Sequence, residues 1–154
     1  TMNTADRSVE ALDTALRRRF SFVEMPSQPK LIEPTVVEGV DLLALLNSIN
    51  ERVEQLLDKD HHVGHSYFMG LENGADLKRV FATKVLPLLE EYFHGDAKKV
   101  GAVLGEAFVE VRKKTVAFAK GFDMDEYEVK ELYTVKDPRT FTDLAPFKAI
   151  NAGA

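Results

Sequence analysis

Apolar residues recur at helical spacing through residues 42–57, and this pattern constrains the fold more than any other feature of the chain. Asp41 directly precedes the stripe, and an aspartate there can accept a hydrogen bond from a free backbone N–H of the first turn. A helix with one apolar face has to bury it against another element, so the pattern predicts a helical domain. The stripe consists of Leu42, Leu46, Ile49, Val53, Leu56 and Leu57.

Two further segments continue the helical pattern. One begins near Asp76, and Pro87 is expected to kink or restart it because proline has no N–H to donate. A shorter helix, capped by Asp96, is expected to end at Leu104. Three or four helices between residues 41 and 104 predict a small bundle. Its expected core is Leu42, Leu46, Ile49, Val53, Phe81, Val85, Leu88, Leu89, Tyr92 and Leu104.

The pattern changes after Gly105. Residues 107–112 and 115–120 alternate, or nearly so, and are expected to pair as a β-hairpin. Residues 126–135 fit either a further strand or a short helix. From Asp137 onward two prolines favour irregular structure. The apolar side chains expected to dock this tail are Phe141, Leu144, Phe147 and Ile150.

Composition excludes several classes of protein. The chain has no cysteine, so it can form neither disulfides nor thiolate metal sites. A net charge of −5 disfavours nucleic-acid binding through a broad basic face. The apolar runs are too short to cross a bilayer and no secretory signal is visible, so we expect a cytoplasmic location with no membrane contact.

Residues 1–20 place polar groups at both ends of one short expected helix. Asn3, Asp6 and Arg7 precede it, and Arg17-Arg18-Arg19 end it before an apolar segment. Each guanidinium has to stay solvated or find an anionic partner, which leaves two hypotheses: a solvated basic helix, or a phosphate site approached from two directions. Phosphoryl transfer needs a group that orients water and a cation that neutralises developing charge, and an asparagine and an arginine can supply these.

A phosphate-binding loop is the missing part of such a site. No G-x-x-x-x-G-K-[ST] motif occurs in the chain. A nucleotide cradle is therefore expected upstream of Thr1, and these residues alone are expected to be inactive as a hydrolase and to bind nucleotide weakly or not at all.

A glycine-bounded aromatic segment, Gly64-His65-Ser66-Tyr67-Phe68-Met69, follows the first helix. His61, His62 and His65 lack an acidic or thiol partner at a ligand-like spacing, so we expect no metal site. His65 and Ser66 either meet a ligand or neighbouring domain, or cap the next structural element. The two interpretations have about equal weight.

Several motifs occur in a fixed order. They are Thr1-Met2-Asn3-Thr4-Ala5-Asp6-Arg7-Ser8, then Asp13, Ala15-Leu16-Arg17-Arg18-Arg19-Phe20, Gly64-His65-Ser66-Tyr67-Phe68-Met69 and Pro87-Leu88-Leu89-Glu90-Glu91-Tyr92-Phe93. Together they resemble the C-terminal part of the AAA+ domain of McrB-type proteins. Those proteins are the GTP-hydrolysing motor subunits of the modified-cytosine-dependent restriction endonuclease. The resemblance covers roughly residues 1–104.

The resemblance implies roles for individual residues. Asn3 would be the sensor-1 amide that positions water at the γ-phosphate. Asp6 and Arg7 would support the nucleotide site, and Arg7 alternatively reaches an adjoining subunit. Arg18 would be the arginine finger that acts in trans on the neighbouring subunit, with Arg19 as the second choice.

His65 and Ser66 stand where many AAA+ proteins keep a sensor-2 arginine, and the resemblance implies that they support nucleotide binding. Arg79 is a weak substitute for that arginine. The implied cofactor is GTP or ATP with Mg²⁺ in the full-length protein, and none is expected in these residues alone. The implied partners are a homo-hexamer, an endonuclease subunit, and DNA through other domains or the assembled ring.

The expected fold class is mainly α. Residues 1–35 would be the end of an AAA+ α/β core, residues 36–105 a helical lid, and residues 106–154 a β-rich or irregular C-terminal extension. Two alternatives stay open: a non-catalytic helical interaction module, or another AAA+ motor of the chelatase or dynein kind. A glycine-rich loop and an acidic pair in the gene upstream of Thr1 would favour the motor, and their absence would favour the interaction module.

Overall fold

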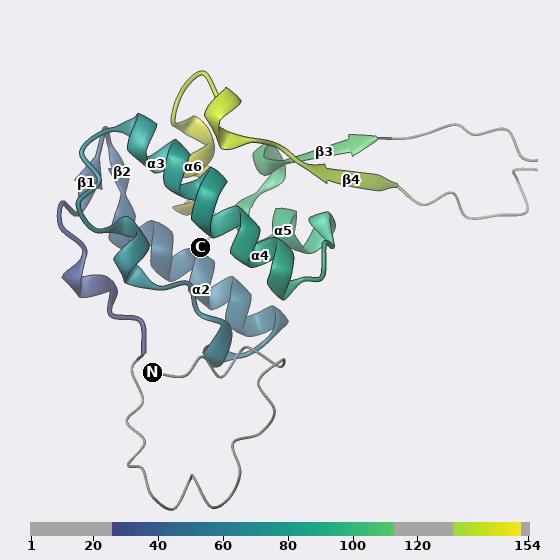
Figure 1. The fold of residues 1–154 in the computed structure, drawn as a ribbon, viewed down its shortest axis with the longest axis horizontal. Coiled ribbons are helices and arrows are strands. Elements are labelled where there is room, and N and C mark those ends of the chain that lie inside the picture. Colours follow the sequence, from purple (N-terminus) through teal and green to yellow (C-terminus); the bar gives the residue numbers. More distant parts are fainter. Residues whose placement is uncertain (1–25, 113–130, 152–154) are drawn as a thin grey trace, which may run out of the picture.

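The computed structural model describes residues 26–112 and 131–151 (Figure 1). This part of the chain is mostly helical and carries two small antiparallel strand pairs, which confirms the mainly α expectation for it. Its α-helices are α2 (Leu42–Leu56), α3 (Gly74–Val80), α4 (Leu86–Tyr92), α5 (Ala97–Leu104) and α6 (Ala145–Asn151). Its strands are β1 (Val36–Val37), β2 (Val40–Asp41), β3 (Val109–Arg112) and β4 (Leu132–Val135). None of the described helices is long and apolar enough to cross a membrane.

Helix α2 begins at the predicted cap. Asp41 Oδ1 accepts a 2.9 Å hydrogen bond from the backbone N–H of Ala44, which satisfies one of the free donors of the first turn. The predicted cap of α5 is also confirmed, because Asp96 Oδ1 accepts from the N–H groups of Lys98 and Lys99. Both helices therefore begin where a carboxylate side chain precedes an apolar stripe.

Helix α3 begins two residues before the predicted position. Asn73, rather than Asp76, is the cap, and its Oδ1 accepts from the N–H of Asp76 at 3.0 Å. Asp76 instead lies in the first turn, where a carboxylate is favoured by the helix dipole.

The expected interruption at Pro87 is confirmed. Helix α3 passes into α4 through a π-helical turn over Phe81–Val85, in which the N–H of Leu86 donates to the carbonyl oxygen of Phe81. Pro87 lies in the first turn of α4, where its missing N–H is tolerated. The chain therefore restarts as α4 after the wider turn, although Pro87 supplies no helical donor.

The core is shared by residues from before and after Gly105. Of the expected core, Leu88 and Tyr92 are only partly buried and the other members are buried. The centre also holds two rings that the helical period does not reveal, those of Phe147 and Phe108, whose centroids lie 4.8 Å and 5.8 Å from the centroid of the Phe81 ring. The predicted docking of the tail is confirmed, although its last part is the helix α6 rather than irregular chain. Leu144, Phe147 and Ile150 are buried and Phe141 is partly buried.

Strands β1 and β2 form a hairpin that the sequence analysis did not predict. Val37 pairs with Val40, so Glu38 and Gly39 form a two-residue loop in which both residues have positive φ, 47° and 79°. Such loops match the twist of the paired strands and favour glycine. The Glu38 carboxylate also accepts a 2.8 Å hydrogen bond from the N–H of Gly74, which ties this hairpin to the start of α3.

Strand β3 pairs with β4 in an antiparallel register that sets Val109 opposite Val135 and Arg112 opposite Leu132. Of the two structures predicted for residues 126–135, the strand is confirmed at β4. Residues 115–120, the predicted partner of residues 107–112, lie outside the described residues.

Candidate functional site

The predicted site residues divide into two groups. Asn3, Asp6, Arg7, Arg18 and Arg19 lie outside the described residues, so their predicted roles stay predictions. His65 and Ser66 lie in a 3₁₀ turn, His65–Phe68, on the loop between α2 and α3. This loop is the candidate site that the structure describes.

His65 is bound to the segment that leads into the bundle. Its Nδ1 atom accepts a 3.0 Å hydrogen bond from the backbone N–H of Gln28. An imidazole nitrogen accepts a hydrogen bond through its lone pair, so Nδ1 is the acceptor atom of this contact. Ser66 is exposed. The structure therefore brings His65, but not Ser66, into a contact between two distant segments.

The other end of the loop makes a second contact with the same segment. The N–H of Gly70 donates to the carbonyl oxygen of Glu33 at 2.8 Å. Gly70 has a φ of 68°, a conformation that glycine adopts without strain. Phe68 in the loop and Ile32 in the entering segment are both fully buried members of the hydrophobic core, so each segment is anchored in the core close to these hydrogen bonds.

The other histidines of this region belong to the end of α2. His61 Nδ1 lies 2.6 Å from Asp58 Oδ1, and the hydrogen bond with His61 lowers the pKa of the Asp58 carboxyl. The His61 ring also packs edge-on against Tyr92, with centroids 4.8 Å apart. His62 Nε2 lies 3.1 Å from Glu54 Oε2. Within the described ranges no group of three or more His, Cys, Asp or Glu residues could hold a metal ion.

Arg79, the weak substitute for a sensor-2 arginine, is exposed and engaged on its own helix. Its guanidinium donates to Asp76 Oδ1 at 2.9 Å. This hydrogen bond lowers the pKa of the Asp76 carboxyl. In this conformation Arg79 serves the first turn of α3 rather than a ligand.

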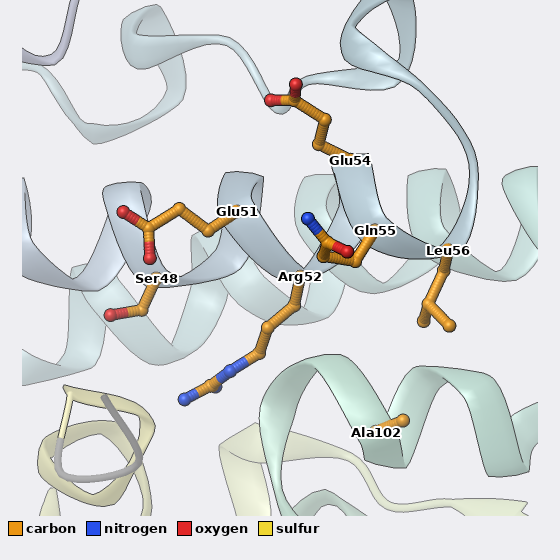
Figure 2. Close-up of a pocket in the computed structure, with 7 residues that line it drawn as sticks. All are labelled: Ser48, Glu51, Arg52, Glu54, Gln55, Leu56 and Ala102. Carbon is orange, nitrogen blue, oxygen red and sulfur yellow. The ribbon is translucent and has the colours of Figure 1, made fainter.

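An open groove of about 620 Å³ lies along α2 where it faces α5 (Figure 2). Arg52 crosses it, and its guanidinium donates to the carbonyl oxygens of Val103 and Ile150, each at 2.8 Å. This contact has no local sequence signal, because its acceptors are backbone carbonyls far away in the chain. The groove is lined by Ser48, Glu51, Arg52, Glu54, Gln55, Leu56 and Ala102.

The groove carries no recognisable chemistry for a small ligand. Its one cation among the lining residues is already bound to two carbonyl oxygens. Leu56, which the helical stripe predicted on the apolar face, is 41% exposed at its edge. The loop at His65 is therefore the stronger candidate.

Comparison with known proteins agrees with this architecture. Residues 41–101 match the family described as McrB, alpha-helical lid domain. One curated relative is the Type IV methyl-directed restriction enzyme EcoKMcrB subunit of Escherichia coli strain K12. It is 40% identical over 118 residues, an alignment that covers 64% of this chain and 25% of the relative. The aligned part of the relative is thus about a quarter of its length.

Proposed function

We propose that the chain works as part of an AAA+ nucleoside-triphosphatase subunit of a DNA-restriction system, with residues 41–101, which match the McrB lid family, as its helical lid. The observation that carries the proposal is the match of the lid to this family together with 40% identity to a restriction-enzyme subunit. The order of the motifs before and within the lid supports it.

Asn3 and Arg18 would act on different nucleotides. Asn3 would orient the attacking water at the γ-phosphate of its own subunit, with Asp6 and Arg7 in support. Arg18, with Arg19 as the second choice, would reach the nucleotide of the neighbouring subunit and neutralise charge in the transition state. The assembly would be a hexamer that uses GTP or ATP with Mg²⁺ and acts on DNA with an endonuclease subunit.

Substitution of the finger in the full-length protein tests this assignment. Arg18→Ala is expected to lower kcat by roughly 10³-fold or more and to leave nucleotide affinity nearly unchanged, because a finger acts chiefly on the transition state. Arg17→Ala is the matched control, since it removes a neighbouring arginine of the same run. Turnover at the wild-type rate in Arg18→Ala would rule out the finger assignment.

Mixing two inactive variants tests whether Arg18 acts in trans. Asn3→Ala and Arg18→Ala subunits are each expected to be inactive alone. In a random mixture of equal amounts, some sites have an Arg18→Ala subunit that supplies the intact Asn3 and an Asn3→Ala neighbour that supplies the intact Arg18. This arrangement occurs at about a quarter of the interfaces of a cyclic ring. Recovery toward that fraction of wild-type hydrolysis supports the proposal, and a mixture as inactive as its components contradicts a finger in trans.

A further inference from the structure

The segment that enters the lid is held along its length. This entry segment, residues 28–37, is the purple stretch that leads up to β1 in Figure 1. It begins with the 3₁₀ turn Pro29–Leu31, and its apolar residues Ile32 and Val37 are 0% and 2% exposed. At its end the carbonyl oxygen of Thr35 accepts from the N–H of Leu42 at 2.8 Å. The entry segment is therefore packed into the lid although it precedes the first lid helix.

Two hydrogen bonds align the entry segment with the loop after α2. Gln28 is hydrogen-bonded to His65, and Glu33 is hydrogen-bonded to Gly70. The second contact therefore lies five residues after the first in both segments. The two segments thus run side by side in the same direction. The His65 side chain makes the first of these contacts, at the point where the described chain enters the lid.

We propose that His65 is a positioning residue that fixes the entry segment to the lid, so that residues 28–37 and the lid change orientation as one body during nucleotide turnover. The inference rests on the proposed function. The segment with the proposed finger ends nine residues before Gln28, at Arg19, so a lid that holds Gln28 can pass its movement along a short stretch of chain. This role differs from the nucleotide contact expected for His65.

The chemistry of the contact sets the choice of variants. Asparagine carries its Oδ1 atom at the same place along the side chain as Nδ1 of histidine, so His65→Asn keeps an acceptor for Gln28. Glutamine carries its acceptor one bond further out, and alanine has none. Met69→Ala is the matched control, because Met69 is 48% exposed and directly follows the same turn.

Hydrogen exchange of the full-length protein, followed by mass spectrometry on peptides that span residues 27–33, measures the contact directly. His65→Ala is expected to speed exchange at the Gln28 amide by about tenfold, the effect of losing one hydrogen bond. His65→Asn is expected to restore most of the protection, His65→Gln to restore less, and Met69→Ala to leave exchange at the Gln28 amide unchanged. Unchanged exchange in His65→Ala, or no rescue by asparagine, would overturn the proposal.

Steady-state kinetics separate positioning from nucleotide contact. If His65 positions the entry segment, His65→Ala lowers kcat with little change in the KM for nucleotide, and His65→Asn recovers kcat. A raised KM with unchanged kcat would instead place His65 at the nucleotide and overturn the positioning role.

The exchange experiment needs no hydrolysis, so it tests the contact even if the wild-type protein proves not to be a motor. Thermal melting of each variant identifies any that fails to fold, and His65→Gln then replaces His65→Ala in both measurements.

Discussion

The guanidinium of Arg52 donates a 2.8 Å hydrogen bond to the backbone carbonyl oxygen of Ile150, a residue 98 positions away in the sequence. A second N–H of the same guanidinium donates to the carbonyl oxygen of Val103 at 2.8 Å. Both acceptors lie in the last turn of their helices, where carbonyls lack intrahelical donors and a positive charge is favoured. Arg52 of α2 thus caps the C-terminal ends of both α5 and α6.

Loss of this arginine is expected to destabilise the fold. Arg52→Met keeps much of the apolar side chain but leaves two part-buried carbonyls without their charged donor, so we expect a loss of about 1.5–3 kcal/mol in the free energy of unfolding. Urea denaturation followed by circular dichroism measures it. Arg79→Met is the control, because the ion pair of Arg79 with Asp76 is exposed to solvent and contributes little to stability. Equal effects of the two substitutions would contradict a special role for Arg52.

The aromatic rings around Phe147 indicate that helix α6 contributes to the stability of the helical bundle. Phe147 is fully buried and its ring packs edge-on against Phe81. Phe147→Ala removes a large side chain from the centre of the core, so we expect a loss of about 3–5 kcal/mol. Thermal and chemical denaturation measure it, and Leu132→Ala, at a residue 51% exposed, is the control. If Phe147→Ala unfolded in the same range as the control, α6 would not contribute to the lid core.

The backbone conformation of Gly39 in the β1–β2 hairpin is expected to make the fold sensitive to substitution at this position. Gly39 has a φ of 79°, and a Cβ atom there would lie 3.1 Å from Nζ of Lys148. Gly39→Ala is therefore expected to cost about 1–2 kcal/mol, mostly from the left-handed backbone conformation. Gly64→Ala is the matched control, because Gly64 has a φ of −72° and its added Cβ would meet only Ser66 Oγ at 3.6 Å. Comparable melting temperatures for the two variants would show that the turn relaxes without strain.

Local patterns predicted helices α2 and α5 well because the causes of these helices are local. The stripe of α2 and the caps at Asp41 and Asp96 depend on residues within one or two turns, and the structure confirms both caps and the stripe from Leu42 to Val53, whereas Leu56 is exposed. The interruption before α4 follows from the missing N–H of Pro87. Such features need no knowledge of the rest of the chain.

Contacts between distant segments could not be predicted in the same way. The partner of His65 is a backbone N–H 37 positions away, and the acceptors of Arg52 are backbone carbonyls, which every residue carries. The β1–β2 hairpin has only two residues in each strand, too few for an alternating pattern. The proposed catalytic residues Asn3 and Arg18 lie outside the described residues, so only the lid side of the candidate site can be compared with the prediction.

Ionisation of Tyr92 is expected to lower the stability of the folded chain in alkali. Burial raises the pKa of its phenol from 10.0 to about 12, and the neighbouring Tyr67 and Glu91 add to the shift. Because the folded pKa is raised, the contribution of the neutral phenol is fully present below pH 10.0 and is lost as the pH rises toward 12. Stability is thus expected to fall across this window as the unfolded chain ionises first.

The Tyr92→Phe variant isolates this contribution, because phenylalanine keeps the ring that packs on His61 but cannot ionise. We expect the stability of the wild-type chain to decline more steeply than that of Tyr92→Phe between pH 10 and 12, as measured by urea denaturation at several pH values. Tyr133→Phe is the control for a tyrosine on strand β4, whose pKa is raised mainly by its hydrogen bond to Glu131. Parallel pH profiles for the wild type and Tyr92→Phe would mean that the phenol of Tyr92 ionises as readily in the folded lid as in the unfolded chain.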